Sequence, residues 1–262
     1  MISRPRFISD KSLSKGRREQ MMDARFLRNE MLWGKEGQAR LARAHVILFG
    51  LGGVGSYVAE CLARSGIGEL TLVDGDTVAL SNLNRQLEAL SSTIGLPKAE
   101  AVARRIAEIN PEAVLHPMQA LYNADNRALF FPEGCHYDYI VDAIDLVSCK
   151  LDLAETARRL HIPLIMALGT GNKLDPFLLR LADISETYGC PLARVMRREL
   201  RSRGIQHQTV VFSPEEPAPT VQLEAPPPGR RSVPASVSWV PSCAGLMMAG
   251  DVIMTLAGRN QA

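Results

Sequence analysis

Residues 46–78 read VILFGLGGVGSYVAECLARSGIGELTLVDGDTV. A short apolar run meets four closely spaced glycines, an amphipathic segment follows, and a second apolar run ends at Asp74. This pattern predicts a βαβ unit in which Gly50, Gly52, Gly53 and Gly55 let backbone N–H groups approach a phosphate at a helix N-terminus. The acid after the second strand suits a ribose hydroxyl. Because the fingerprint fits NAD, FAD and ATP alike, it does not identify the nucleotide.

The segment that follows, residues 74–100, reads DGDTVALSNLNRQLEALSSTIGLPKAE and is unusually rich in polar side chains for a dehydrogenase. A pyrophosphate is neutralised mainly by backbone groups and a helix dipole, so two further cations would be surplus. A triphosphate attacked at phosphorus needs side-chain cations where negative charge develops. Taken singly, each cation could be a solvated surface charge. Together with the neighbouring polar side chains, the cations favour a nucleoside triphosphate over NAD. The full set is Asp76, Asn82, Arg85, Gln86 and Lys98.

Several motifs together resemble the ThiF/MoeB/HesA superfamily, whose members adenylate a carboxylate with ATP. They are GLGGVG (50–55), DGDTVALSNLNRQ (74–86), GLPKAE (95–100), INP (109–111) and VDAID (141–145). The resemblance covers roughly residues 25–170 and implies ATP and Mg²⁺ as cofactors. It implies that Asp74 binds the ribose, that Asn82, Arg85, Gln86 and Lys98 surround the phosphates, and that Asp145 holds the metal. Asp142, three residues earlier, reads as a strand-end hydrogen-bond acceptor instead.

The same resemblance implies a homodimer in which an N-terminal arginine enters the neighbouring subunit's site. Arg28, in DARFLRNEML, matches that arginine, and Arg25 is the alternative. An ordinary surface arginine on a helix would look the same in the sequence.

Periodicity predicts an α/β fold: a doubly wound, mainly parallel Rossmann-like sheet with antiparallel C-terminal strands and a terminal helix. Strands are expected at 113–117, 139–142 and 163–167, and helices at 98–108, 124–131 and 148–160. After residue 168 the pattern predicts a turn, an antiparallel strand and a helix with Pro191 in its first turn. We expect residues 209–237, which contain seven prolines, to be a long mobile loop that is neither helix nor central strand. A buried apolar helix over 244–258 would close a single adenylation domain spanning 25–262, preceded by a basic extension, 1–24.

Three C-terminal phrases resemble one branch of the superfamily, the bacterial tRNA threonylcarbamoyladenosine dehydratases. They are TGNKLDP (170–176), CPLARVMRRELRSRGI (190–205) and SWVPSCAGLMMAGDVI (238–253). That branch activates the carboxylate of the threonylcarbamoyl group with ATP and closes it to a cyclic form. The alternative is an activator of a ubiquitin-like sulfur carrier, and a third reading is a non-catalytic or redox module that binds NAD. Five arginines within residues 194–203 favour the tRNA enzyme, because tRNA requires phosphate contacts, although a solvated helix face would look the same.

Composition agrees with a globular cytoplasmic protein. The chain has 262 residues, 46% of them hydrophobic and 22% charged, and a net charge of +2. No signal peptide or membrane span is expected, because the apolar C-terminal run is short and interrupted by Asp251.

The five cysteines form no Cys-x-x-Cys pair, so the zinc site of several relatives is not expected; a sulfur-relay protein remains a candidate partner. Cys243 is the best candidate for a catalytic thiol, with Cys190 weaker, but packing as a small apolar residue is more common. The five histidines show no metal-ligand spacing.

Overall fold

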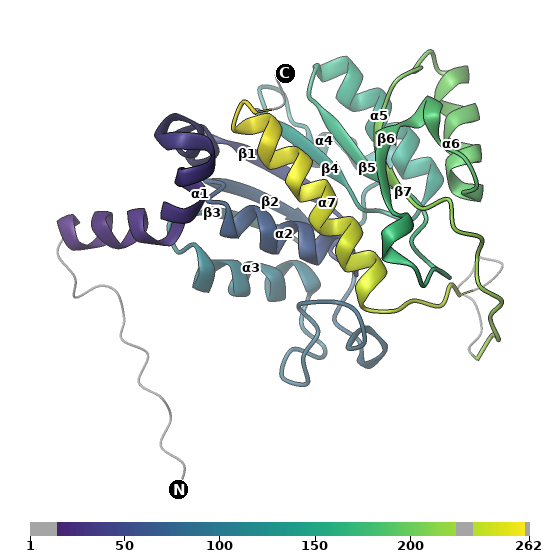
Figure 1. Cartoon of the computed structure of the whole chain (residues 1–262), viewed down its shortest axis with the longest axis horizontal. Helices are drawn as coiled ribbons and strands as arrows, with labels where there is room; N and C mark the ends of the chain where they lie inside the picture. The colour runs from purple at the N-terminus through teal and green to yellow at the C-terminus, as the bar shows by residue number, and fades with distance from the viewer. Residues whose placement is uncertain (1–14, 224–232, 260–262) are drawn as a thin grey trace, which may run out of the picture.

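The computed structural model describes residues 15–223 and 233–259, and the side chains from residue 24 onward. Its centre is a seven-stranded sheet with the order β3-β2-β1-β4-β5-β7-β6 (Figure 1). Every neighbouring pair is parallel except the last, in which β6 runs antiparallel to β7. The strands are β1 (His45–Phe49), β2 (Glu69–Val73), β3 (Val114–Met118), β4 (Tyr139–Asp142), β5 (Leu164–Ala167), β6 (Arg180–Asp183) and β7 (Thr209–Phe212). The predicted doubly wound sheet is confirmed.

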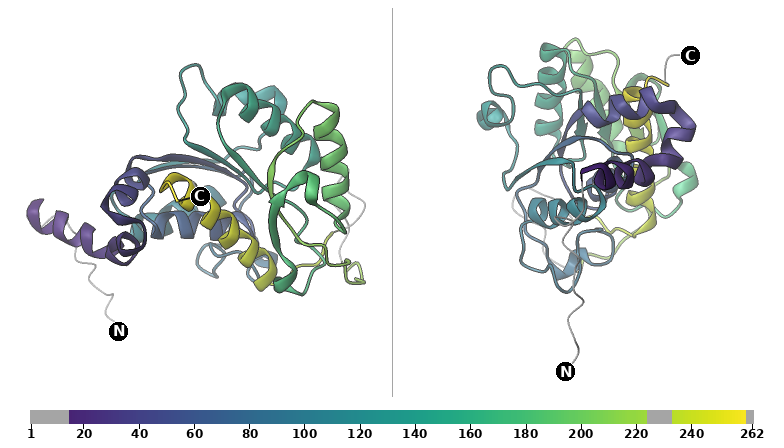
Figure 2. Two further views of the ribbon diagram at one scale, coloured as in Figure 1. Left: turned by 45° about the horizontal axis from the view of Figure 1, so that its top comes forward. Right: turned by 90° about the vertical axis from the view of Figure 1, so that its left-hand side faces the viewer.

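Helices cover both faces of the sheet, as the alternation of strands and helices predicts (Figure 2). Side chains that alternate along β1 show why: Val46 and Leu48 join one core cluster, whereas Ile47 and Phe49 join the other. The first cluster is packed by α2 (Gly55–Arg64), α3 (Lys98–Ile109) and α7 (Trp239–Leu256). The second is packed by α4 (Arg127–Phe130), α5 (Val147–Leu160) and α6 (Pro191–Ser202). All strands are therefore buried from both sides except at the sheet edges.

Helix α1 (Lys15–Arg43) precedes the sheet and is interrupted at Gly34, where φ is 75°. The helix therefore begins within the basic extension 1–24 and continues past residue 25, where the predicted adenylation domain begins. Between β3 and β4, the expected helix 124–131 is a 3₁₀ turn (Ala124–Asn126) followed by the single turn α4. Asn123 explains this start, because its side chain accepts hydrogen bonds from the backbone N–H groups of the 3₁₀ turn.

The expectation that residues 209–237 form one loop is wrong at its beginning. Thr209–Phe212 is β7, which pairs with β5 on one side and β6 on the other. The first proline of the segment is Pro214, so the β-branched and apolar run before it is free to donate to the sheet. Beyond β7, the described ends of the proline-rich segment lie against one loop: Asn172 accepts a hydrogen bond from Ala218 N–H and exchanges bonds with Ala235. Residues 224–232 lie outside the described part of the chain.

The terminal helix α7 is long and apolar enough to cross a membrane by length and composition alone. In this fold it packs against the sheet and α2, with Ala244, Met248 and Val252 fully buried. Its acid, Asp251, accepts a hydrogen bond from Tyr139 at 3.2 Å, and burial, together with this carboxylate, raises the pKa of the Tyr139 phenol. Burial in the core accounts for the apolar composition of α7.

Candidate functional site

The glycine loop joins β1 to α2 at the carboxyl edge of the sheet. Gly50 adopts φ +85°, and a Cβ atom there would lie 2.7 Å from the Ala143 carbonyl oxygen of the β4 loop. A Cβ on Gly55 would lie 1.7 Å from the Gly50 carbonyl oxygen. Only glycine fits both positions, so the loop closes tightly between β1 and β4. Strand order reverses at this point of the sheet, and doubly wound proteins bind ligands there.

Asp74 holds this loop in place. Its Oδ2 accepts the Leu51 N–H at 2.7 Å, and its Oδ1 accepts the Asp76 N–H at 2.8 Å. Each carboxylate oxygen has a second lone pair, so the same group can also accept from a ribose hydroxyl. The predicted strand-end acid is therefore next to the glycine loop.

Arg85 and Gln86 face the glycine loop from the segment that follows β2. A Cβ on Gly52 would lie 3.5 Å from Gln86 Nε2, and one on Gly53 would lie 3.4 Å from Arg85 Cγ. The Arg85 guanidinium donates to the Ser81 carbonyl oxygen at 2.9 Å and to Asn84 Oδ1 at 2.8 Å, which fixes its direction. Both residues predicted to contact phosphate thus line the loop that would cradle it.

Lys98 and Asn82 complete the predicted polar set. Lys98 is the first residue of α3 and only 5% exposed, and its Nζ lies 3.0 Å from Asp76 Oδ2. Asn82 is also buried, and its side-chain oxygen accepts the Ala79 N–H at 3.0 Å. The Asp76 carboxylate itself is 66% exposed, so it lies between the buried ammonium and solvent.

The two acids of VDAID take the places that the sequence predicts. Asp142 is completely buried: it accepts the Ile144 N–H at 3.0 Å and pairs with Lys150 Nζ at 3.0 Å. Its interpretation as a strand-end acceptor is confirmed. Asp145 is exposed in the loop beyond β4, on the same edge of the sheet as the glycine loop. Of the two, only Asp145 is exposed, and its predicted role as the metal-binding acid stays a prediction.

Arg28 is not brought to the glycine loop of its own chain. It is exposed on α1, and α1 meets the C-terminal end of α7 through hydrogen bonds from Arg40 to the Ala257 carbonyl and from Arg259 to the Leu32 carbonyl. The other end of α7 meets the glycine loop, because Pro241 lies against Gly53. Asn29, next to Arg28, donates to the Arg64 carbonyl oxygen at the last residue of α2, and the ten residues of α2 place this contact about 15 Å from Gly55.

Among the described residues, sequence reasoning missed two buried ionisable side chains whose charged atoms have no hydrogen-bond partner. Glu88 is 2% exposed, and neither of its carboxylate oxygens has a hydrogen-bond partner of normal geometry among the described residues. Burial raises the pKa of Glu88 to about 7, and the neighbouring Lys98 ammonium limits the rise. Lys173, in the TGNKLDP loop, is buried with its Nζ likewise unpaired within residues 24–223 and 233–259. Buried charges without partners are rare and often mark ligand sites, but a Glu or Lys between polar neighbours gives no such signal in a sequence.

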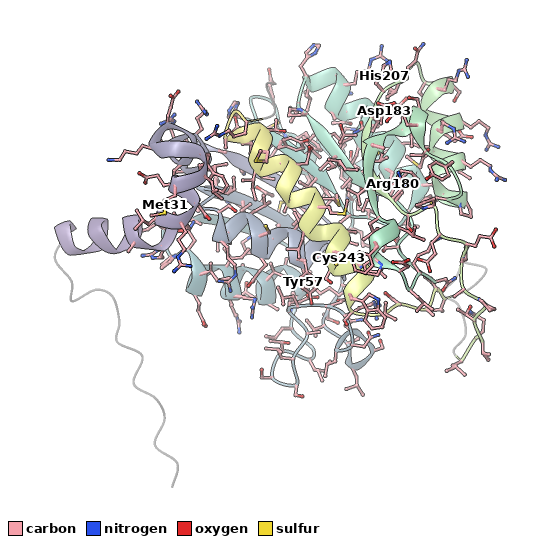
Figure 3. All side chains as sticks on the ribbon, in the orientation of Figure 1. Met31, Tyr57, Arg180, Asp183, His207 and Cys243 are labelled. Atoms are coloured by element: carbon pink, nitrogen blue, oxygen red, sulfur yellow. The ribbon has the colours of Figure 1, made fainter. Side chains whose placement is uncertain are left out.

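The two cysteines considered as catalytic thiols lie at helix starts and are packed against the protein core. Cys243, labelled in Figure 3, lies near the start of α7 and packs partly buried against the first core cluster. Cys190 is buried, and its sulfur accepts the Ala193 N–H at the start of α6. Burial raises the pKa of Cys61. All five cysteines are free.

The arginines of α6 divide into two groups. Arg197 is committed to its own chain, because its guanidinium donates to Thr187 Oγ1 at 2.7 Å and to the Thr187 carbonyl oxygen. Arg194, Arg198 and Arg201 are exposed, although Arg198 also pairs with Glu199, as does Arg203 just after the helix. Beside α6 lies an open depression of about 520 Å³, lined by Glu155, Arg158, Arg159, His161, Arg203 and Ile205. The end of α5 therefore extends the basic surface beyond the ten residues identified in the sequence.

A glycine loop at the strand-order reversal, surrounded by Asp, Asn, Arg, Gln and Lys, defines a nucleotide-binding protein of the doubly wound α/β class. The chain belongs to the ThiF family, and its match to the family model covers residues 26–262.

Curated relatives narrow the family. The chain is 42% identical over 240 residues to the tRNA threonylcarbamoyladenosine dehydratase of Bacillus subtilis. This match covers 88% of this chain and 94% of that protein. The molybdopterin-synthase adenylyltransferase of Haemophilus influenzae is 33% identical over 130 residues, half of this chain. The resemblance to the dehydratase therefore spans most of the chain, whereas the resemblance to the adenylyltransferase spans half of it.

A solved structure agrees. The Escherichia coli tRNA N6-threonylcarbamoyladenosine dehydratase, TcdA, in complex with ATP superposes with a TM-score of 0.78 at 34% identity, over 97% of this chain and 99% of that one. The same enzyme in complex with AMP superposes equally well. The fold expectation and the expected branch of the family are both confirmed.

Proposed function

We propose that this protein is an ATP-dependent dehydratase that acts on the threonylcarbamoyl group of N6-threonylcarbamoyladenosine in tRNA. The observation that carries the proposal is full-length similarity to dehydratases of this kind, together with a glycine loop surrounded by the side chains that adenylation requires. The substrate carboxylate attacks the α-phosphorus of ATP, and pyrophosphate leaves. A nucleophile within the same substituent then attacks the activated carbonyl carbon, and AMP leaves as the ring closes. Because both reactants are held together, proximity supplies much of the rate.

In this proposal, backbone N–H groups of the glycine loop and the α2 N-terminus bind phosphate, and Asp74 binds the ribose. Lys98 and Arg85 stabilise charge that develops on the phosphates, while Asn82 and Gln86 orient phosphate oxygens. The buried, unpaired Gln86 Oε1 beside Gly52 fits a site that a ligand completes.

Magnesium fits the same edge of the sheet. Asp145 and Asp76 are both exposed there, and Mg²⁺ prefers one or two carboxylates together with phosphate oxygens and water. When bound, the ion would neutralise phosphate charge and make pyrophosphate a better leaving group.

Two features of the proposal concern the assembly and the substrate. The position of Arg28 beside the C-terminal end of α2, about 15 Å from Gly55, supports a homodimer in which Arg28 serves the partner's site. The exposed arginines of α6 and the basic depression at the end of α5 support tRNA contact.

The continuous seven-stranded sheet supports a single domain over residues 25–262. The five free cysteines fit a reducing, cytoplasmic environment.

The decisive test is turnover on tRNA. The protein is incubated with ATP, Mg²⁺ and bulk tRNA that carries the modification, and the tRNA is then digested to nucleosides and analysed by mass spectrometry. The proposal predicts loss of the mass of one water from the modified nucleoside, dependent on ATP. If the protein instead adenylates only the C-terminus of a small carrier protein, the activator alternative is correct.

A further inference from the structure

A second cluster of ligating side chains lies at the amino edge of the sheet, opposite the glycine loop. It consists of His45 at the start of β1, Glu69 at the start of β2 and His116 in β3. Their ligand atoms all lie within 4.8 Å of one another. Glu69 Oε1 lies 2.7 Å from His116 Nε2 and 3.5 Å from His45 Nδ1. Nitrogen atoms of two imidazoles thus converge on one carboxylate oxygen.

Strand register produces this convergence. His45 is paired with Glu69 across β1 and β2, and His116 is paired with Thr71 across β2 and β3. Glu69 and Thr71 are two residues apart, so their side chains emerge on one face of the sheet, together with those of their partners. The three residues are far apart in the chain, and only the parallel order β3-β2-β1 brings them together.

Neighbouring groups hold the most buried of the three side chains in a ligating orientation. The other ring nitrogen of His45, Nε2, lies 2.9 Å from Thr71 Oγ1, and the Tyr137 ring packs edge-on against the imidazole at 4.6 Å. Asp138 accepts the His45 backbone N–H at 2.8 Å. Metal-bound histidines are usually oriented in this way, by a hydrogen bond from the nitrogen that does not bind the ion.

We propose that His45, Glu69 and His116 bind a divalent transition-metal ion of the zinc type, at a site separate from the nucleotide site. Two imidazole nitrogens and one carboxylate oxygen are donors that Zn²⁺ takes at about 2.0–2.2 Å, which places donor atoms about 3.3 Å apart in a tetrahedral complex. The separations in the cluster bracket that value. Mg²⁺ and Ca²⁺ prefer all-oxygen sites and are excluded by the two imidazoles.

The ion would serve the fold rather than the reaction. It would join the amino ends of β1 and β2 to the middle of the edge strand β3. The five residues of β1 place the cluster about 15 Å or more from Gly50, because a strand rises about 3.3 Å per residue. His116 is half-exposed on the edge strand, so water has access to the remaining coordination position.

Metal binding can be measured directly on the full chain after removal of bound metal with a chelator. Calorimetric titration with Zn²⁺ at pH 7.5 gives stoichiometry and affinity, and titration with Co²⁺ gives an absorption spectrum that reports the ligand type. Glu69→Gln keeps the shape of the side chain and removes its charge, and His116→Ala removes a half-exposed ligand. His207→Ala is the matched control, because His207 pairs with Asp183 at 3.5 Å in another part of the molecule (Figure 3).

We expect one Zn²⁺ per chain with a Kd of about 10 µM or tighter, corresponding to a binding free energy of roughly 7 kcal/mol. Each ligand variant should weaken binding at least about tenfold, whereas His207→Ala should not change it. Zn²⁺ should raise the Tm of the wild type and not of the ligand variants, and the ATP-dependent activity of the variants should stay at the wild-type level. A Kd in the millimolar range, unchanged affinity in both ligand variants, or a Co²⁺ spectrum with thiolate charge-transfer bands would overturn the proposal.

Discussion

In the proposed nucleotide site, Lys98 supplies a buried ammonium group. It is nearly inaccessible and pairs with the exposed Asp76 at 3.0 Å, so the charge is held in place before a phosphate arrives. Preorganised cations of this kind stabilise developing charge by several kcal/mol. Lys98→Met, which keeps the volume but not the charge, should lower turnover by about 10²–10³-fold and leave the Tm within a few degrees. Arg104→Ala, on the exposed face of the same helix, is the control, and near wild-type turnover in Lys98→Met would remove Lys98 from the mechanism.

Asp145 should act through the metal and not through the phosphate. Its exposed position beyond β4 allows a bound Mg²⁺ to keep most of its water, as this ion prefers. For Asp145→Asn we therefore expect a higher Mg²⁺ concentration at half-maximal activity, with partial recovery at saturating metal. A Mg²⁺ titration of the rate separates this result from that of Lys98→Met, which added metal should not rescue. An unchanged Mg²⁺ requirement would contradict the assignment.

Glu88 should make stability depend on pH in an unusual direction. Its pKa is about 7 in the folded protein and 4.5 in the unfolded chain, so folding favours the protonated acid. Below pH 4.5 both states hold the proton. Between pH 4.5 and 7 only the unfolded chain loses it, so this contribution to stability falls as the pH rises and then levels off.

Glu88→Gln removes that dependence. Relative to the wild type, the variant should gain about 2.5 kcal/mol between pH 5 and pH 8, the part of the effect of a pKa rise from 4.5 to about 7 that develops in this range. Denaturant unfolding of both proteins at several pH values measures the gain. If the difference between them is the same at pH 5 and pH 8, the Glu88 carboxyl group is not protonated in the fold as described.

At the scale of single elements, helix α6 provides the test of tRNA binding. The structure removes Arg197 from the set of candidate contacts, because its guanidinium is bound to Thr187. Arg194, Arg198 and Arg201 remain exposed. Replacing these three with Ala should weaken tRNA binding and flatten its log–log salt dependence by roughly 0.7–0.9 per lost phosphate contact.

ATP affinity should not change in this triple variant, because α6 lies outside the glycine-loop site. The control removes equal charge elsewhere, through Arg43→Ala, Arg64→Ala and Arg104→Ala. If the two triple variants bind tRNA equally well over a range of salt, α6 is only a solvated helix face.

Elements that depend on local sequence patterns could be predicted, whereas those that depend on contacts between distant residues could not. Local patterns sufficed for the glycine loop, the strand-end Asp74 and most strands, because they depend on periodicity and glycine spacing. The same reasoning failed at β7, where nearby prolines obscured a β-branched run of only four residues. It could not find the cluster of His45, Glu69 and His116, since strand register and not spacing brings these residues together. The buried state of Glu88 was equally hidden, because it depends on packing between α2, α3 and the end of β2.

At the scale of the whole molecule, α7 separates two regions that the proposed reaction must combine. Its first turn lies against Gly53, and its last turn is bound by Arg40 of α1. Leu27, Met31 and Leu32 expose apolar surface on α1, beside Arg28. Apolar residues exposed around a cation suit a subunit interface better than free solvent. A two-fold dimer would therefore bury this face and carry Arg28 to the partner's nucleotide site.

Subunit mixing tests this arrangement. Arg28→Ala and Asp145→Ala each disable one half of a shared site, so each homodimer should have little activity. In a heterodimer, one of the two sites would contain both Asp145 and the partner's arginine, and the other would contain neither. An equimolar mixture after exchange contains half heterodimers, so we expect about one quarter of the wild-type activity per site, on the statistics of a two-fold dimer. Exchange is monitored by native mass spectrometry of size-tagged subunits, and Arg25→Ala replaces Arg28→Ala in a parallel mixture to test the neighbouring arginine. No recovery despite demonstrated exchange would mean that Arg28 does not act across the interface.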